Sequence, residues 1–190
     1  MTLLAVIAAA YVGVAQRPPV WRFVNAPVRQ ASYDHGYMYA FTFASVTYVA
    51  DVTLDSLPKG REAAICGRSG WHNAIFVRED GTLRFTCFDY AGRKSGDVYS
   101  KKPIVTGRQY RVAGVVDCSH GNETRLRLYV DGELQGEIVA FEGAPFVYPW
   151  KVWVGQVGET GGKPNLPMDG TVRSFWYFHQ PLTKEEIDAL

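Results

Sequence analysis

Seven residues whose side chains could bind a sugar occur in stretches of the sequence that we predict to be loops. An aromatic ring can stack on the apolar face of a sugar, while planar imidazole, amide and guanidinium groups can bond its hydroxyl groups. The seven residues are Trp71, His72, Asn73, Tyr90, Arg93, Tyr148 and Trp150. Packing is the commoner role for any single one of them, because most tryptophan and tyrosine side chains are largely buried. We predict that a bound ligand would contact the loops that carry Trp71, Tyr90 and Trp150.

Catalytic motifs are absent from the sequence. It contains no HExxH zinc motif and no GxSxG nucleophile elbow. Retaining glycoside hydrolysis needs two carboxyl groups ~5 Å apart, which a Glu-x-Asp-x-x-Glu strand supplies, and that pattern does not occur either. The acidic residues Glu185, Glu186 and Asp188 lie in a predicted terminal helix, where helix capping explains them. We therefore predict that the protein is not an enzyme.

Composition and charge restrict the class of protein. The chain has 190 residues, of which 47% are hydrophobic and 21% charged, as in a single globular domain. The formal net charge is +1, so no strong electrostatic field would attract nucleic acid. An odd number of cysteines, Cys66, Cys87 and Cys118, excludes a fully paired set of intrachain disulfides. Their apolar surroundings predict buried free thiols, and their spacing does not fit a zinc site.

The N-terminal stretch 1–15 is apolar and has two interpretations. Gly13-Val14-Ala15 resembles a signal-peptide cleavage site, but no basic residue precedes the apolar run. The alternative is a strand or arm that docks on the domain or on a neighbouring chain, which would make residues 1–16 an assembly contact. The stretch is too short for a membrane span. We assign 1–36 to this arm and a connector, and 37–190 to the folded domain.

Two Asp-Gly pairs predict β-hairpins. Asp131-Gly132 follows the alternating residues of 125–130, and Asp80-Gly81 separates two further strand patterns. Asp-Gly is favoured in two-residue hairpin turns because both residues tolerate a positive φ. We place one face of these strands in the core, with the inward residues Leu83, Phe85, Leu126, Leu128 and Val130.

The other elements follow from periodicity and from turn residues. Strands are predicted over 37–43, 46–54, where the alternation predicts one polar face, and 171–179. Loops are predicted over 89–103, 141–150 and 155–167. A capping box formed by Thr183 and Glu186, with Leu182 and Ile187 as a hydrophobic staple, predicts a helix at the C-terminus. Many short strands and little helix predict an all-β fold, a two-sheet antiparallel β-sandwich or jelly roll with a short C-terminal helix.

Five motifs in fixed order resemble one known family. They are VTLDSLPKG at 52–60, DGTLRF at 80–85, VAGVVD at 112–117, LRLYVDGELQGE at 126–137 and PLTKEEIDAL at 181–190. Together they are similar to the laminin G-like, concanavalin A-like lectin and glucanase jelly-roll superfamily. The resemblance covers roughly residues 37–190.

The resemblance implies a role in recognition. It implies a lectin-like, adhesive module outside the cell or on a cell or virion surface that binds a glycan or a protein partner. The alternative is a structural or decoration protein of a virion or surface assembly. The family often holds structural calcium with acidic residues near the start of its last strand, where this chain has Arg173 and Ser174. A guanidinium cannot ligate Ca²⁺, so we expect no metal there and no cofactor, and we interpret Asp169 as a turn residue.

Overall fold

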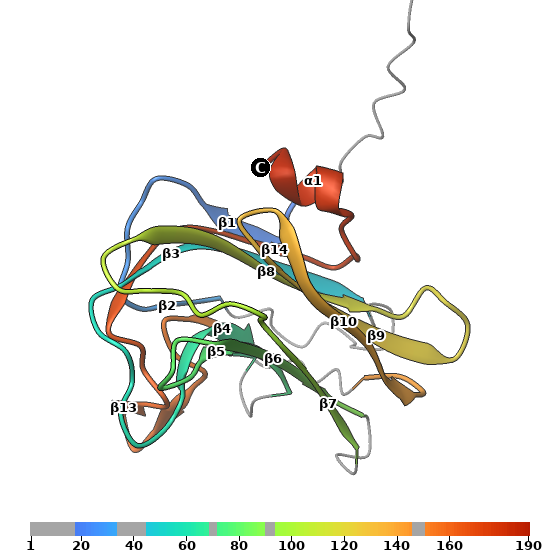
Figure 1. Cartoon of the computed structure of the whole chain (residues 1–190), viewed down its shortest axis with the longest axis horizontal. Helices are drawn as coiled ribbons and strands as arrows, with labels where there is room; N and C mark the ends of the chain where they lie inside the picture. The colour runs from blue at the N-terminus through green and yellow to red at the C-terminus, as the bar shows by residue number, and fades with distance from the viewer. Residues whose placement is uncertain (1–17, 34–44, 69–71, 90–93, 146–150) are drawn as a thin grey trace, which may run out of the picture.

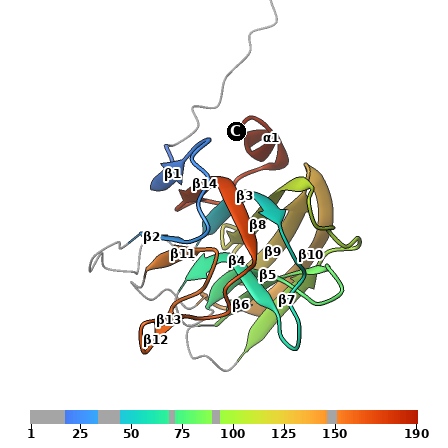
Figure 2. The ribbon, with the colours of Figure 1, turned by 90° about the vertical axis from the view of Figure 1, so that its left-hand side faces the viewer.

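The fold is a sandwich of two antiparallel six-stranded sheets, seen in a computed structural model that describes residues 18–33, 45–68, 72–89, 94–145 and 151–190. Figure 1 and the turned view in Figure 2 show the sheets as stacked layers, with the short helix α1 (Lys184–Asp188) on the outer side of one of them. The predicted β-sandwich with a C-terminal helix is confirmed. The predicted strand over 37–43 and the arm over 1–16 lie outside the described residues.

The first sheet contains six strands in the order β1 (Trp21–Phe23), β14 (Gly170–Phe178), β3 (Val46–Leu54), β8 (Gln109–Asp117), β9 (Glu123–Val130) and β10 (Glu133–Glu142). The second sheet has the order β2 (Ala31–Tyr33), β11 (Val152–Val154), β4 (Ala63–Arg68), β5 (Asn73–Val77), β6 (Leu83–Phe88) and β7 (Ser95–Tyr99). A separate small ribbon pairs β12 (Glu159–Thr160) with β13 (Lys163–Pro164). Strands β1 and β2 come from the stretch that we assigned to the arm and connector, and they pair with β14 and β11.

The two Asp-Gly pairs form different turns. Asp131 and Gly132 have φ angles of 49° and 75° and join β9 to β10, which confirms this two-residue hairpin. At the second pair only Gly81 has a positive φ. The ladder between the strands ends at the pair Val77 and Leu83, so five residues separate β5 from β6. The Arg78 amide donates to the Thr82 carbonyl (2.9 Å), so the two-residue prediction is wrong here. An additional bond from the Thr82 amide to the Asp80 carboxylate (2.9 Å) stabilises the wider turn.

The predicted core face is confirmed. Leu83, Phe85, Leu126 and Leu128 are fully buried between the sheets, and Val130 is half-buried against the same cluster. Strand β3, which is separated from β9 by β8 in the first sheet, also contributes to this core, and its inward residues are fully buried. Burial of this apolar surface is the main stabilising term of the fold.

Strand β3 is not amphipathic as predicted, because the outer face of the first sheet is covered as well. Val49 and Trp176 pack there with Leu182 and Ile187, the two residues of the predicted staple. The predicted capping box at the start of α1 is confirmed. The Thr47 hydroxyl donates to the Gln180 carbonyl (2.7 Å) and accepts from the Leu182 amide (3.0 Å), which holds the C-terminal segment against β3. Thr47, a polar residue that we expected to face water, therefore holds the segment before α1 against the sheet.

Three segments predicted as loops contain more order than expected. The stretch 89–103 contains the edge strand β7, whose polar sequence gives little strand signal because one face is solvent-exposed. Phe141 is buried and belongs to β10. In 155–167, Gln156 and Val157 are buried, and Val157 packs on Phe76 at the outer face of the second sheet. These residues are buried by partners distant in sequence, which local patterns do not reveal.

The cysteines are free thiols. Cys66 and Cys87 are fully buried and Cys118 is half-buried, in agreement with the prediction. Burial raises the pKa of all three thiols, so none is an activated nucleophile. Among the described residues, we find no helix that is long and apolar enough to cross a bilayer.

Candidate functional site

The described residues that flank three predicted ligand loops lie next to one another, at what we call the loop end of the sandwich. The amide of Phe88, the last residue of β6, donates to the His72 carbonyl (2.9 Å). Asp89 pairs with Pro145 in an isolated antiparallel bridge. Val152 pairs with Arg68 across β11 and β4. The chain therefore enters and leaves the stretches 69–71, 90–93 and 146–150 at neighbouring strand ends.

A polar cluster crosses the gap between the two sheets at the loop end. The Arg68 side chain from β4 is 5% exposed and donates to the Tyr177 hydroxyl on β14 (2.5 Å). Its guanidinium carbon lies 5.8 Å from the centre of the Tyr177 ring, within the range of a cation–π contact. Tyr48 stacks on Tyr177 (5.2 Å), and its hydroxyl donates to Oδ1 of Asn73. The cluster therefore links β4 and β5 to β3 and β14 through oriented polar groups.

Two histidines border this cluster. The His179 ring meets Tyr177 edge-on (5.1 Å), and the His72 ring meets Phe88 edge-on (6.3 Å). Burial, reinforced by the positive charge of Arg68, lowers the pKa of both imidazoles, that of His179 to about 4. Both rings are therefore neutral at pH 7, and a neutral imidazole can donate one hydrogen bond and accept another. This combination suits the recognition of hydroxyl groups.

Sequence reasoning missed Arg68 and Tyr177. A register shift between Ala64 and Cys66 places Ile65 and Cys66 both in the core. Strict alternation therefore predicts the wrong face for the residues that follow the bulge. Tyr177 follows apolar residues in its strand and has no local mark that separates it from a core tyrosine. The available signal is Arg68 itself, which follows Gly67 at the end of the apolar run of β4.

The structure describes two of the seven predicted ligand residues. His72 is half-buried beside the cluster, whereas Asn73 is 2% exposed and supports Tyr48 from within the sandwich. The other five lie outside the described residues and stay predictions; they are Trp71, Tyr90, Arg93, Tyr148 and Trp150.

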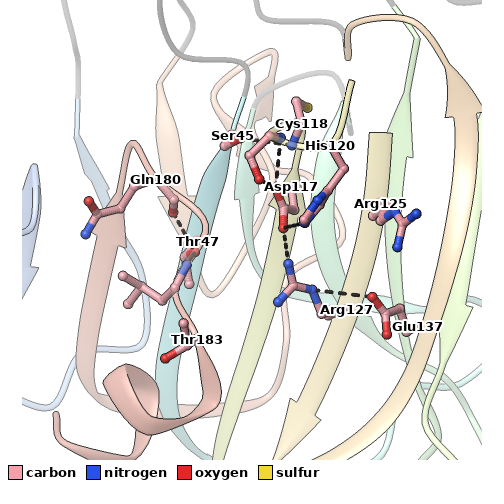
Figure 3. A network of polar contacts seen from close by, with 12 residues as sticks. Ser45, Thr47, Asp117, Cys118, His120, Arg125, Arg127, Glu137, Gln180 and Thr183 are labelled. Carbon is pink, nitrogen blue, oxygen red and sulfur yellow. Dashed lines mark hydrogen bonds and ion pairs between the residues drawn. The ribbon is translucent and has the colours of Figure 1, made fainter. Parts of the chain in front are cut away.

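A second polar cluster lies on the outer face of the first sheet (Figure 3). The Asp117 carboxylate is almost fully buried, accepts from the Ser119 amide (2.9 Å) and hydroxyl (2.6 Å), and pairs with Arg127. His120 Nε2 lies 3.3 Å from the same carboxylate, and Arg127 Nε lies 3.7 Å from Glu137. Burial acts to raise the pKa of Asp117, but the bonds from Ser119 and the charge of Arg127 outweigh it and lower that pKa. The opposite charges pair with one another, and the bonds from Ser119 to Asp117 order the β8–β9 turn.

The acidic and polar residues at the start of β14 are engaged in contacts within the protein. Arg173 is exposed, and the hydroxyl of buried Ser174 accepts from the Asn25 amide (3.1 Å). Asp169 pairs with Arg29 (3.3 Å), whose guanidinium also pairs with Asp55 (2.9 Å). In the described part of the chain, no three or more His, Cys, Asp or Glu side chains are grouped so as to hold a metal ion. The absence of a calcium requirement stays a prediction.

Comparisons with known proteins agree with this fold. A family model for the concanavalin A-like lectin/glucanases superfamily matches residues 30–188. No curated protein sequence matches the chain. A structure of the NanB sialidase from Streptococcus pneumoniae superposes with a TM-score of 0.68 at 16% identity, covering 92% of this chain and 28% of the sialidase. This chain therefore spans only part of that enzyme.

Two further structures are matched over most of their own length. The CBM40 of the Ruminococcus gnavus IT-sialidase, bound to α2,3-sialyllactose, superposes with a TM-score of 0.62 at 15% identity, covering 90% of this chain and 98% of that one. The native heptameric SAP-like pentraxin of Limulus polyphemus superposes with a TM-score of 0.56 at 18% identity, covering 88% of this chain and 72% of that one. At these identities the likeness shows the fold alone.

Proposed function

Because the chain belongs to the concanavalin A-like lectin/glucanase superfamily, we propose that it is a non-catalytic module that binds a glycan at the loop end. The observation that supports this location is the convergence of the strand ends around 69–71, 90–93 and 146–150. Loops held together by a rigid sandwich commonly carry the binding function of such folds. The predicted aromatic residues Trp71, Tyr90 and Trp150 occur in these three stretches.

The chemistry of the described residues supports recognition of hydroxyl groups. The buried Arg68 and Tyr177 join the two sheets at the loop end, and the half-buried ring of His72 beside them is neutral at pH 7. The thiols nearest in sequence, Cys66 and Cys87, are buried and unreactive. A glycan-binding module without catalysis is in keeping with a location outside the cell or on a surface, which is part of the proposal.

A related structure suggests the first ligands to test. Structures of the CBM40 of the Ruminococcus gnavus IT-sialidase have been solved with bound α2,3- and α2,6-sialyllactose. An immobilised glycan array should therefore include both compounds beside neutral glycans. We expect the wild-type chain to be retained by at least one glycan and to release no free sugar from it.

Variants locate the site. The combined change Trp71→Ala, Tyr90→Ala and Trp150→Ala should abolish retention without lowering the melting temperature, and His72→Ala should weaken it about tenfold. Val105→Ala, an exposed residue remote from the loop end, is the control and should bind as the wild type does. Unchanged binding by the triple variant would place the site elsewhere. A wild-type chain retained by no glycan would contradict the proposal and favour the assembly role.

A further inference from the structure

A hollow of about 420 Å³ lies at the end of the second sheet opposite the loop end. Its lining comes from the residues before β4, Arg61 and Glu62, and from the turn between β5 and β6, Arg78 to Asp80. Because β4 ends and β5 begins at the loop end, these residues lie at the other ends of the same strands. The volume falls in the range of small-molecule sites, roughly 300–1,000 Å³.

An exposed aromatic ring stands beside the hollow. Tyr99 on the edge strand β7 is 47% exposed, although tyrosine side chains usually bury most of their surface. The Arg78 guanidinium carbon lies 5.6 Å from the Tyr99 ring centre, and Arg78 also lines the hollow. Tyr99 pairs with Arg84 in the register of β6 and β7. The ring thus lies next to planar charged groups, an arrangement suited to stacking on a sugar ring.

The polar groups of the hollow are held in place and carry charges of both signs. Arg84 bonds Glu62 (2.9 Å) and Asp97 (2.7 Å) and lies 4.8 Å over the buried Phe76 ring, so Glu62 is fixed from beneath. The four other lining residues are two cations and two carboxylates, Arg61, Arg78, Glu79 and Asp80. With Glu62, the lining holds two cations and three carboxylates, a formal charge of −1. It therefore disfavours an anionic ligand, and its interleaved donors and acceptors suit a neutral, hydroxyl-rich one.

From this geometry we infer that the chain has a second saccharide contact, in which Tyr99 stacks on a neutral sugar and Arg78 with Glu62 bonds its hydroxyl groups. This contact goes beyond the proposed loop-end site and does not depend on it. Strand β6, with six residues at about 3.3 Å each, separates the two sites by roughly 20 Å. Two contacts at that spacing would allow the chain to bind an extended glycan or two glycan chains.

Titration of the ¹⁵N-labelled full chain tests this contact. The probes are lactose, maltotriose and cellotriose, all neutral, at millimolar concentrations, with spectra that resolve the Arg78 Nε–Hε signal and the Tyr99 amide. We expect at least one probe to shift both signals. Tyr99→Ala and, separately, Arg78→Ala should weaken that binding about tenfold, whereas Tyr99→Phe should retain it. Val139→Ala, an exposed edge residue of the first sheet, is the control.

The outcomes separate the two sites. If no probe moves the Arg78 and Tyr99 signals, or if Tyr99→Ala binds as the wild type does, the second contact is disproved. The His72 signal reports the loop end in the same spectra. Shifts at Tyr99 without shifts at His72 would support the second contact and count against the loop-end site for that probe.

Discussion

Arg68 and Tyr177 join the two sheets at the loop end through a bond between a buried guanidinium and a phenol hydroxyl (2.5 Å). A buried arginine stays charged, so it requires partners that offset the cost of leaving water. The Tyr177 hydroxyl is one such partner, and the face of its ring is another.

Removing this hydroxyl should destabilise the fold. We expect Tyr177→Phe to lower the free energy of unfolding by about 1–3 kcal/mol, because Arg68 loses a bond that water cannot replace. Urea denaturation measures the change. Tyr129→Phe, at a largely buried tyrosine on the outer face of the first sheet, is the matched control and should cost less than about 0.5 kcal/mol. Equal effects of the two variants would show that the bond to Arg68 contributes nothing.

The protein should lose stability in mild acid. The pKa of His179 falls from 6.5 to about 4 on folding, so the unfolded chain binds a proton between these values and the folded chain does not. The stability that the neutral His179 gives the folded chain is therefore fully present above pH 6.5 and is lost as the pH falls toward about 4. His72 acts in the same direction. Melting temperatures measured across this window should fall less steeply for His179→Gln than for the wild type; parallel curves would contradict the assignment.

Two leucines of one hairpin should differ in their contribution to stability. Leu128 is fully buried, so Leu128→Ala should cost about 2–5 kcal/mol by leaving a cavity. Leu134 is 38% exposed, and Leu134→Ala should cost far less. Chemical denaturation of both variants compares them directly. A loss below ~1 kcal/mol for Leu128→Ala would mean that the core face is misassigned.

Calcium should not affect stability. The Arg29 guanidinium already pairs with both Asp55 and Asp169 and occupies the place where a cation would otherwise be attracted. We expect the same melting temperature in EDTA and in millimolar CaCl₂. Arg29→Gln should cost less than about 1 kcal/mol, because this ion pair is largely exposed. A calcium-dependent rise in the melting temperature of the wild type would show that a metal site exists.

The sequence by itself determined the features that depend on neighbouring residues. The Asp131-Gly132 turn requires two residues that tolerate positive φ, and the alternation of Leu126 and Leu128 selects the face that enters the core. The capping box at Thr183 starts α1 through bonds within one turn. These local rules were enough to identify a β-sandwich with a terminal helix.

Only the tertiary structure decided the features that depend on distant partners. Arg68 faces the core because a bulge shifts β4 by one residue, and its bond to Tyr177 joins positions 109 residues apart. Val49 is buried on the outer side of β3 because α1 packs there, and Tyr99 stands beside the hollow because β7 pairs with β6. Such contacts arise when the sheets close on each other, so the residue types and spacing of a single stretch do not encode them.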